Sequence, residues 1–250
     1  MMHAIRLEFY KLRRKRLTLM FALFLAVELG WAFASLSMSI ARRPDNAGWP
    51  AAIATVASMN GLFLPILSAV IVSRICDMEH KGQTWKLLMS AAVARSRIYA
   101  AKYIAACLLL AVAVALQAAG IAAFGMARGW AEAVPVALLF RYAAGTMLAT
   151  AAIVALQQWL SLAVKNQAFA LALGMLGGFA GMTADLFPAG IRAGLIWSYF
   201  TGLSPVTFGY IDETMRYVLR DISPSHALAA LAMGAAAYIA GSIHVSRQEI

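Results

Sequence analysis

The chain has 250 residues, of which 62% are hydrophobic and 13% are charged, and its net charge is +10. Because soluble domains carry about a quarter charged residues, this composition excludes an ordinary soluble domain and favours an integral membrane protein. The positive charge belongs to no basic domain outside the apolar runs, so we expect no nucleic-acid partner.

The first expected element is a basic amphipathic segment over residues 1–16. Its sequence HAIRLEFYKLRRKR interleaves apolar side chains with cations. This pattern is typical of a helix that lies in the membrane interface and contacts anionic lipid headgroups. A plain cationic anchor that holds the N-terminus in the cytoplasm explains the same residues equally well.

Six apolar runs follow that are long enough to cross a membrane, which takes about 20 residues. In lipid these runs must be helices, because each backbone N–H and C=O needs an internal partner. We therefore predict an all-α integral membrane protein with a single transmembrane domain over residues 1–250. The predicted spans are Leu17–Ile40, Ala51–Ile75, Tyr103–Ala127, Val136–Val164, Ala168–Ala184 and His226–Ile243.

Residues 76–102, between the second and third spans, form the largest interior cytoplasmic segment and are dense in charge. Gly82 can end the helix that extends from the second span, since glycine accepts a left-handed cap. A short helix can then begin near Gln83, with Trp85 and Leu88 on one face. That face can dock in a groove of a cytosolic partner or lie on lipid with its tryptophan at the interface. The residues by themselves favour neither interpretation.

Polar side chains inside the predicted spans are candidates for function. Glu28 lies midway along the first span, where a carboxylate is costly and a functional role is the usual hypothesis. It can line a substrate path, carry a proton, or pair with a polar group such as Gln157, and a protonated structural carboxyl is the other interpretation. Gln117 and Gln158 add further polar groups in the third and fourth spans.

The fifth span contains glycines at a spacing that permits close contact between helices. Gly174 and Gly178 form one small-xxx-small pair, and Gly177 and Gly181 form another. Packing against another helix of the same chain is sufficient to explain both pairs.

The segment 185–225 before the last span interrupts the pattern of long helices. Its first half, Ile191–Ile211, is apolar enough to span, but Pro205 removes a backbone hydrogen bond near its centre. We expect broken, re-entrant or extracellular short helices here, and a helix on the surface over the charged residues 212–221. A real seventh span would instead move the C-terminus to the other side of the membrane.

Six spans with a cytoplasmic N-terminus place about two thirds of the 21 lysines and arginines on the inner side. This bias agrees with the excess of cations in cytoplasmic loops. Both termini are therefore expected in the cytoplasm.

The segment 76–102 resembles the permeases of ATP-binding-cassette exporters of the type-2 class, especially those of lantibiotic immunity and peptide-antibiotic export. An acid, a glycine and a short apolar helix precede an R-x-R-x-Y-x-x-K motif that enters the third span. The residues that carry the resemblance are Glu79, Gly82, Thr84, Trp85, Leu87, Leu88, Arg95, Arg97 and the run Tyr99–Lys102. The basic start, the six spans and the broken region before the last span match in the same order.

The resemblance implies that residues 76–102 contain the coupling helix that sits in a cleft of the ATPase subunit. Carried over to this chain, the ATPase-coupling residues are Glu79, Gly82, Trp85, Leu88, Arg95 and Arg97. Ala94 stands where the family usually has another small residue or a proline, which weakens the expected turn. The family also places its first and fifth spans at the dimer interface, which makes Gly174 and Gly178 interface candidates.

This chain has no G-x-x-x-x-G-K-[ST] loop, so it is not expected to be an enzyme. ATP and magnesium would bind to a separate cytosolic ATPase, and no cofactor or metal is expected in this chain. Its scattered histidines and two cysteines form no ligand pattern. The expected assembly joins two permeases, identical or related, with two ATPases in a bacterial cytoplasmic membrane, and confers antibiotic resistance by expelling an amphipathic peptide.

Two other classes of function remain as alternatives. An ATP-independent secondary transporter or channel would show coupling-ion residues or inverted repeats with paired broken helices, and only one broken region is found. A membrane-anchored assembly factor would need no conduction path at all.

Overall fold

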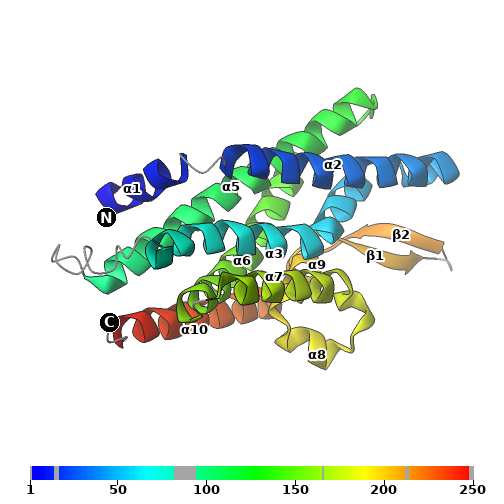
Figure 1. Cartoon of the computed structure of the whole chain (residues 1–250). Helices are drawn as coiled ribbons and strands as arrows, with labels where there is room; N and C mark the ends of the chain where they lie inside the picture. Colours follow the sequence, from blue (N-terminus) through cyan, green and yellow to red (C-terminus); the bar gives the residue numbers. More distant parts are fainter. Residues whose placement is uncertain (1, 14–16, 82–93, 165, 212–213, 248–250) are drawn as a thin grey trace.

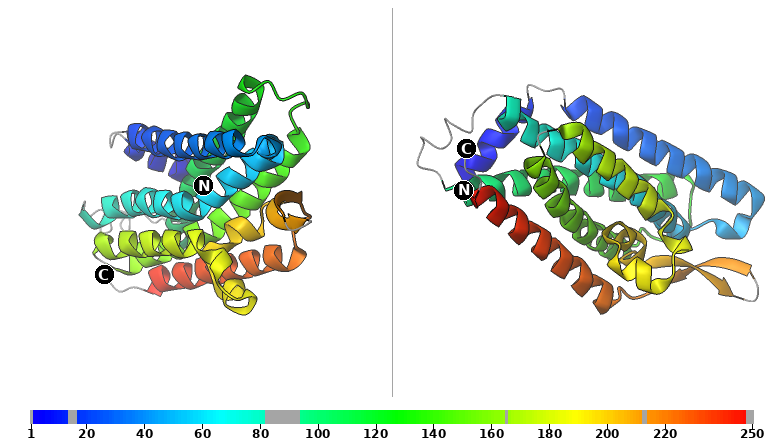
Figure 2. Two further views of the ribbon diagram at one scale, coloured as in Figure 1. Left: turned by 90° about the vertical axis from the view of Figure 1, so that its right-hand side faces the viewer. Right: turned by 60° about the horizontal axis from the view of Figure 1, so that its bottom comes forward.

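The computed structural model describes residues 2–13, 17–81, 94–164, 166–211 and 214–247. It is an assembly of long helices that lie side by side, with a small β-hairpin at one end (Figures 1 and 2). The long elements are α1 (Met2–Arg13), α2 (Leu17–Arg42), α3 (Trp49–Lys81), α5 (Arg95–Ala127), α6 (Val136–Ala163), α7 (Gln167–Met182) and α10 (Pro224–Arg247).

Five of these helices, α2, α3, α5, α6 and α10, are long and apolar enough to cross a membrane. They correspond to five of the six predicted spans, although α5 begins eight residues before its predicted span and α3 ends six residues after its own. The sixth prediction, Ala168–Ala184, corresponds to α7, which has only 16 residues. At about 1.5 Å per residue α7 is about 24 Å long, which is less than the hydrocarbon thickness of about 30 Å. A full crossing by α7 therefore stays a prediction.

Helix α3 lies at the centre of the molecule and contacts α2, α5, α6 and α7. Its most apolar stretch is 61% buried within the chain, against 22% for both α2 and α10. The two outer helices present rows of exposed apolar side chains, as helices in contact with lipid do. Helix α3 also contains Pro65, which neighbouring helices make tolerable inside a span.

The segment between α7 and α10 is broken into short pieces, and the predicted short helices over Ile191–Ile211 are found up to Gly202 but not over Val206–Ile211, which is a strand. The short pieces are η2 (Ala184–Leu186), α8 (Ala189–Gly194), η3 (Ile196–Ser198) and α9 (Tyr199–Gly202). They lie at the end of the molecule that is opposite to both termini (Figure 1).

The predicted surface helix over residues 212–221 is wrong, because a β-hairpin occupies this region. Strand β1 (Val206–Ile211) pairs with the antiparallel strand β2 (Thr214–Leu219), and Phe208 lies opposite Tyr217. The strands are rich in β-branched and aromatic residues, which favour a pleated conformation, and Pro205 separates β1 from the helices before it. The described residues are mostly helical, in agreement with the predicted all-α membrane class, and they include one two-stranded hairpin.

Candidate functional site

The base of the segment between the second and third spans is formed by the end of α3 and the start of α5. Helix α3 continues through Glu79 to Lys81, and α5 begins at Arg95. The predicted coupling residues Gly82, Trp85 and Leu88 lie outside the described residues. The structure thus defines the two helices on which this segment is mounted.

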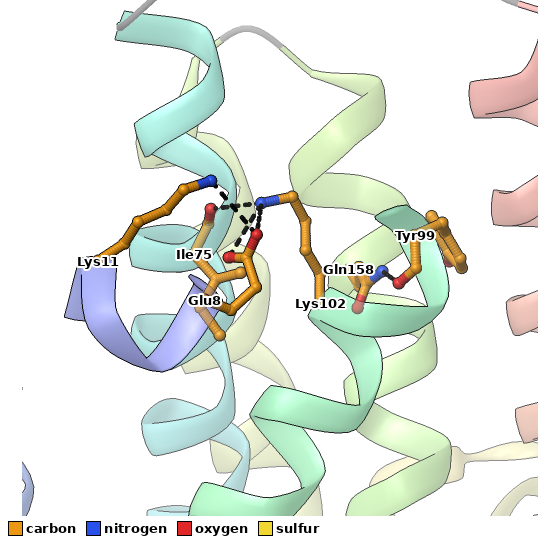
Figure 3. A network of polar contacts seen from close by, with 6 residues as sticks. All are labelled: Glu8, Lys11, Ile75, Tyr99, Lys102 and Gln158. Carbon is orange, nitrogen blue, oxygen red and sulfur yellow. Dashed lines mark hydrogen bonds and ion pairs between the residues drawn. The ribbon is translucent and has the colours of Figure 1, made fainter. Parts of the chain in front are cut away.

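A buried ion pair joins these two helices to the N-terminal helix α1. The Nζ atom of Lys102 on α5 lies 3.2 Å from both carboxylate oxygens of Glu8 on α1. The same Nζ atom donates to the backbone oxygen of Ile75 on α3, at 3.3 Å (Figure 3). Lys102 is 1% exposed and Glu8 is 4% exposed. One ammonium group therefore connects α1, α3 and α5, close to where the segment between α3 and α5 begins and ends. We name Glu8, Lys102 and the Ile75 carbonyl the basal clamp.

Because the basal clamp is buried, each of its two charged groups needs the other to be stable. Two charges removed from water are stable only when good geometry and further hydrogen bonds compensate for the lost hydration. The clamp meets this condition because one ammonium group contacts two carboxylate oxygens and a carbonyl. Lys11, one turn further along α1, lies 3.4 Å from the same carboxylate but is 34% exposed. The position of α1 thus depends chiefly on Lys102.

Sequence analysis included Lys102 in a motif but missed Glu8. A signal for Glu8 was present, because it is the single acidic residue in the basic stretch HAIRLEFYKLRRKR. One acid retained among so many cations indicates a specific partner. Local sequence could not identify that partner, since Glu8 and Lys102 are 94 positions apart.

The first turns of α5 make further contacts with the rest of the bundle. Arg95 donates from Nη1 to the backbone oxygen of Ser246 in α10, at 3.2 Å, whereas Arg97 is exposed. Gln158 of α6 donates to the backbone oxygen of Tyr99 at 2.9 Å (Figure 3). A displacement at the start of α5 would therefore disturb its hydrogen bonds to α6 and α10 as well as the basal clamp.

A second polar cluster, which we name the intramembrane network, lies inside the bundle. The Nε2 atom of Gln117 (α5) donates to Glu28 Oε1 (α2) at 2.9 Å and to Asn60 Oδ1 (α3) at 2.8 Å. The Nδ2 atom of Asn60 donates to the Tyr142 hydroxyl (α6) at 2.9 Å, and this hydroxyl donates to Gln117 Oε1 at 2.8 Å. All four side chains are 0% exposed. Four spans are thus joined by hydrogen bonds around one glutamine.

Only one of the two carboxyl oxygens of Glu28 takes part in this network. Its Oε1 accepts from Gln117, but its buried Oε2 has no hydrogen-bond partner. Gln157, the partner suggested from sequence, donates instead to the backbone oxygen of Ala170 in α7, at 2.5 Å. The two candidates for a substrate path therefore do not meet, and Asn60 and Tyr142 take part in the network although sequence analysis did not single them out.

The glycines of α7 face α3 of the same chain. A Cβ atom at Gly174 would overlap the side chain of Ala69, and one at Gly178 would lie 2.8 Å from the backbone oxygen of Leu62. Both glycines are buried. Their small size is explained by this close packing within one subunit, and they do not form an exposed surface for a second copy.

No group of three or more histidine, cysteine, aspartate or glutamate side chains that could hold a metal ion occurs within the described residues. The charged and polar groups contact one another and the backbone. Such an arrangement can hold helices in register and transmit their movement.

In a comparison with protein families, residues 4–181 match the model of a family described as ABC-2 family transporter protein. The matched region is more than half of the chain and includes α1, the segment between α3 and α5, and nearly all of α7. A comparison with curated proteins gave no match.

Proposed function

The chain belongs to the ABC-2 transporter family, and from this membership we propose that it is the membrane subunit of an ATP-driven exporter. Family membership makes it a multi-pass permease subunit of an ABC transporter and implies ATPase subunits as its partners. The export direction, the substrate and the arrangement of the subunits are the proposed part. We propose two permeases, identical or related, and two cytosolic ATPases in a bacterial cytoplasmic membrane, with both termini of the permease in the cytoplasm.

The basal clamp is the observation that carries this proposal. A helix over residues 83–92 that docks on an ATPase would be mounted between α3 and α5. Lys102 joins these two helices to α1 within the bundle. A push on the segment would therefore move three elements together instead of bending one flexible loop.

Mechanically, closure of the ATPase pair would move the coupling helix, and the spans would follow. The permease then needs two conformations, and ATP must favour one of them by a few kcal/mol. Glu28 and the intramembrane network connect four of the spans, so they are candidates for the region that rearranges. Glu79, Arg95 and Arg97 flank the docking helix and would set its register on the ATPase.

For the substrate we propose an amphipathic peptide or antibiotic that is removed from the bilayer, as in lantibiotic immunity. The support is the resemblance of residues 76–102 to the permeases of that group. An ATP-independent carrier or channel is the competing function.

The test replaces the apolar stripe of the coupling helix. We expect Trp85→Ala with Leu88→Ala to weaken association with the partner ATPase by at least about 30-fold, the loss typical of one hot-spot contact. Membrane insertion should be unchanged. The matched control is Trp31→Ala with Leu19→Ala, which removes the same residue types from exposed positions of α2.

Association is measured by co-purification and by titration of the ATPase against the permease in nanodiscs. Equal binding by the double variant and its control would overturn the docking role of residues 85 and 88. Transport by the purified chain without an ATPase would support the ATP-independent alternative instead.

A further inference from the structure

An open groove of about 720 Å³ runs between the C-terminal half of α2 and the β-hairpin. One wall is the face of α2 that carries Trp31, Ala34 and Met38, and the other wall includes Phe208 and Tyr217. Both elements reach the same end of the molecule, on the right of Figure 1. The volume lies within the range of about 300–1,000 Å³ that is usual for ligand sites.

Large apolar and aromatic side chains form most of the walls of the groove, and Ser35, Ser39 and Asn46 also line it. Trp31 is 66% exposed, Met38 is 58% exposed and Phe208 is 47% exposed. Phe208 and Tyr217 pair across the hairpin with their ring centroids 5.0 Å apart, so they form one continuous aromatic surface. A groove of this kind fits a hydrocarbon chain.

The charge of the groove is concentrated at one end. Arg42 and Arg43 line it where α2 terminates. Among the residues that the structure describes, no carboxylate forms an ion pair with either arginine, although Asp45 follows closely in the chain. The end of the groove is therefore suited to an anionic group.

The length of the groove corresponds to one leaflet of a bilayer. At about 1.5 Å per residue, Trp31 and Arg42 lie about 17 Å apart along the axis of α2. Half of the hydrocarbon core of a bilayer is about 15 Å thick. With the arginines at the headgroup level, Trp31 would lie near the middle of the membrane.

We propose that this groove binds a membrane phospholipid with an acidic headgroup. Its phosphate contacts Arg42 and Arg43, and one acyl chain lies between the Trp31–Met38 face of α2 and the Phe208–Tyr217 pair of the hairpin. The site lies in the leaflet that surrounds the C-terminal end of α2. Lipid binding at this site requires neither ATP nor the ATPase. The proposal is therefore independent of the identity of the transported substrate.

Two other occupants fit the groove less well. A cationic peptide would be repelled by the two arginines. A second copy of the chain, related by a two-fold axis along the membrane normal, would carry its own arginine pair at the same depth. Like charges brought together at the interface would oppose that contact, so a dimer interface formed by the first span, which the family resemblance implies, would use another face of α2.

The experiment measures lipid retained by the purified full chain. The protein is prepared in detergent, titrated with phosphatidylglycerol or with phosphatidylcholine of the same acyl chains, and the bound lipid is counted by native mass spectrometry. We expect wild-type protein to prefer phosphatidylglycerol. The Arg42→Gln/Arg43→Gln variant should lose roughly 30-fold in affinity for it, which is the effect of two cation–headgroup contacts. The control Arg192→Gln removes a cation outside the groove and should bind as wild type does.

A second variant separates the groove from surface charge alone. Ala34→Trp fills the exposed wall of the groove but keeps both arginines, and we expect it to reduce phosphatidylglycerol binding at least tenfold. Leu19→Trp, at the other end of α2, is its control. Unchanged binding by Ala34→Trp, or by the double arginine variant, would overturn the proposal. So would efficient cross-linking of two chains through Ala34→Cys in a background without Cys76 and Cys107, because a second copy would then occupy the groove.

Discussion

Replacing Lys102 by methionine tests whether the basal clamp holds α1 in place. The change keeps most of the side-chain volume but removes the ammonium group that contacts Glu8 and the Ile75 carbonyl. Glu8 is then left as a buried carboxylate, 4% exposed, without its buried partner. The structure therefore predicts that the helix carrying Glu8 leaves its site rather than that the whole bundle unfolds.

The expected magnitude follows from the burial of the pair. Removing one member of a buried ion pair usually costs about 3–5 kcal/mol, because the remaining charge is uncompensated. Lys11 still lies 3.4 Å from Glu8, so we expect the lower end, about 3 kcal/mol. Since 1.4 kcal/mol is a factor of ten, the equilibrium for release of α1 should shift by about 100-fold.

Hydrogen exchange of the α1 backbone amides in nanodiscs measures this equilibrium directly, since exchange reports local opening. Amides of α1 should exchange about 100-fold faster in Lys102→Met than in wild type, whereas amides of α6 should change little. Lys11→Met is the matched control. Its half-exposed pair at i,i+3 is worth about 0.5 kcal/mol or less, so exchange should rise by no more than about twofold.

A double variant separates the charge from the packing. Glu8→Met combined with Lys102→Met replaces the pair by apolar side chains, which is often neutral or stabilising. Slow exchange in α1 should therefore return. The reasoning is refuted if Lys11→Met releases α1 as readily as Lys102→Met, or if the double variant exchanges as fast as the single one.

Two further predictions concern packing and polarity inside the bundle, and both are measured as the free energy of unfolding in detergent. Gln117→Leu should cost about 2 kcal/mol, because it leaves Glu28 without its hydrogen-bond donor and removes one bond each from Asn60 and Tyr142, which still bond to each other. Glu28→Gln should be nearly neutral, since an amide oxygen still accepts. Equal costs would contradict the central position of Gln117. Gly174→Ala should cost about 1–3 kcal/mol through overlap with Ala69, whereas Gly30→Ala, in open space within α2, should be neutral or stabilising by up to about 1 kcal/mol. Similar stability of these two variants would show that α3 and α7 are not closely packed.

The membrane helices could be predicted closely because their signal is local. Prediction and structure both begin the first span at Leu17, and they both begin the fourth at Val136. A long apolar run in lipid must satisfy its backbone hydrogen bonds internally, and only a helix does so within one segment. The hairpin was missed for the opposite reason, since Phe208 pairs with Tyr217 on another strand and the charged residues near them suggested a surface helix.

The site residues divide in the same way. That Glu28 and Gln117 would need partners follows from polarity alone, because a polar group in a span is costly without a hydrogen bond. Which residues supply those partners does not follow, and Gln157 bonds to Ala170 instead of Glu28. Four helices must be packed before the four members of the intramembrane network come within hydrogen-bonding distance.

The membrane class of this protein, its long apolar helices and its basic N-terminal segment could all be predicted from residue order, because hydropathy and backbone hydrogen bonding act along a continuous stretch of chain. Only the tertiary structure revealed the basal clamp, the contact of the α7 glycines with α3, and the groove that ends at Arg42 and Arg43. Each of these depends on groups that are far apart in the chain. The groups that form these three features come into contact only when the helices have packed.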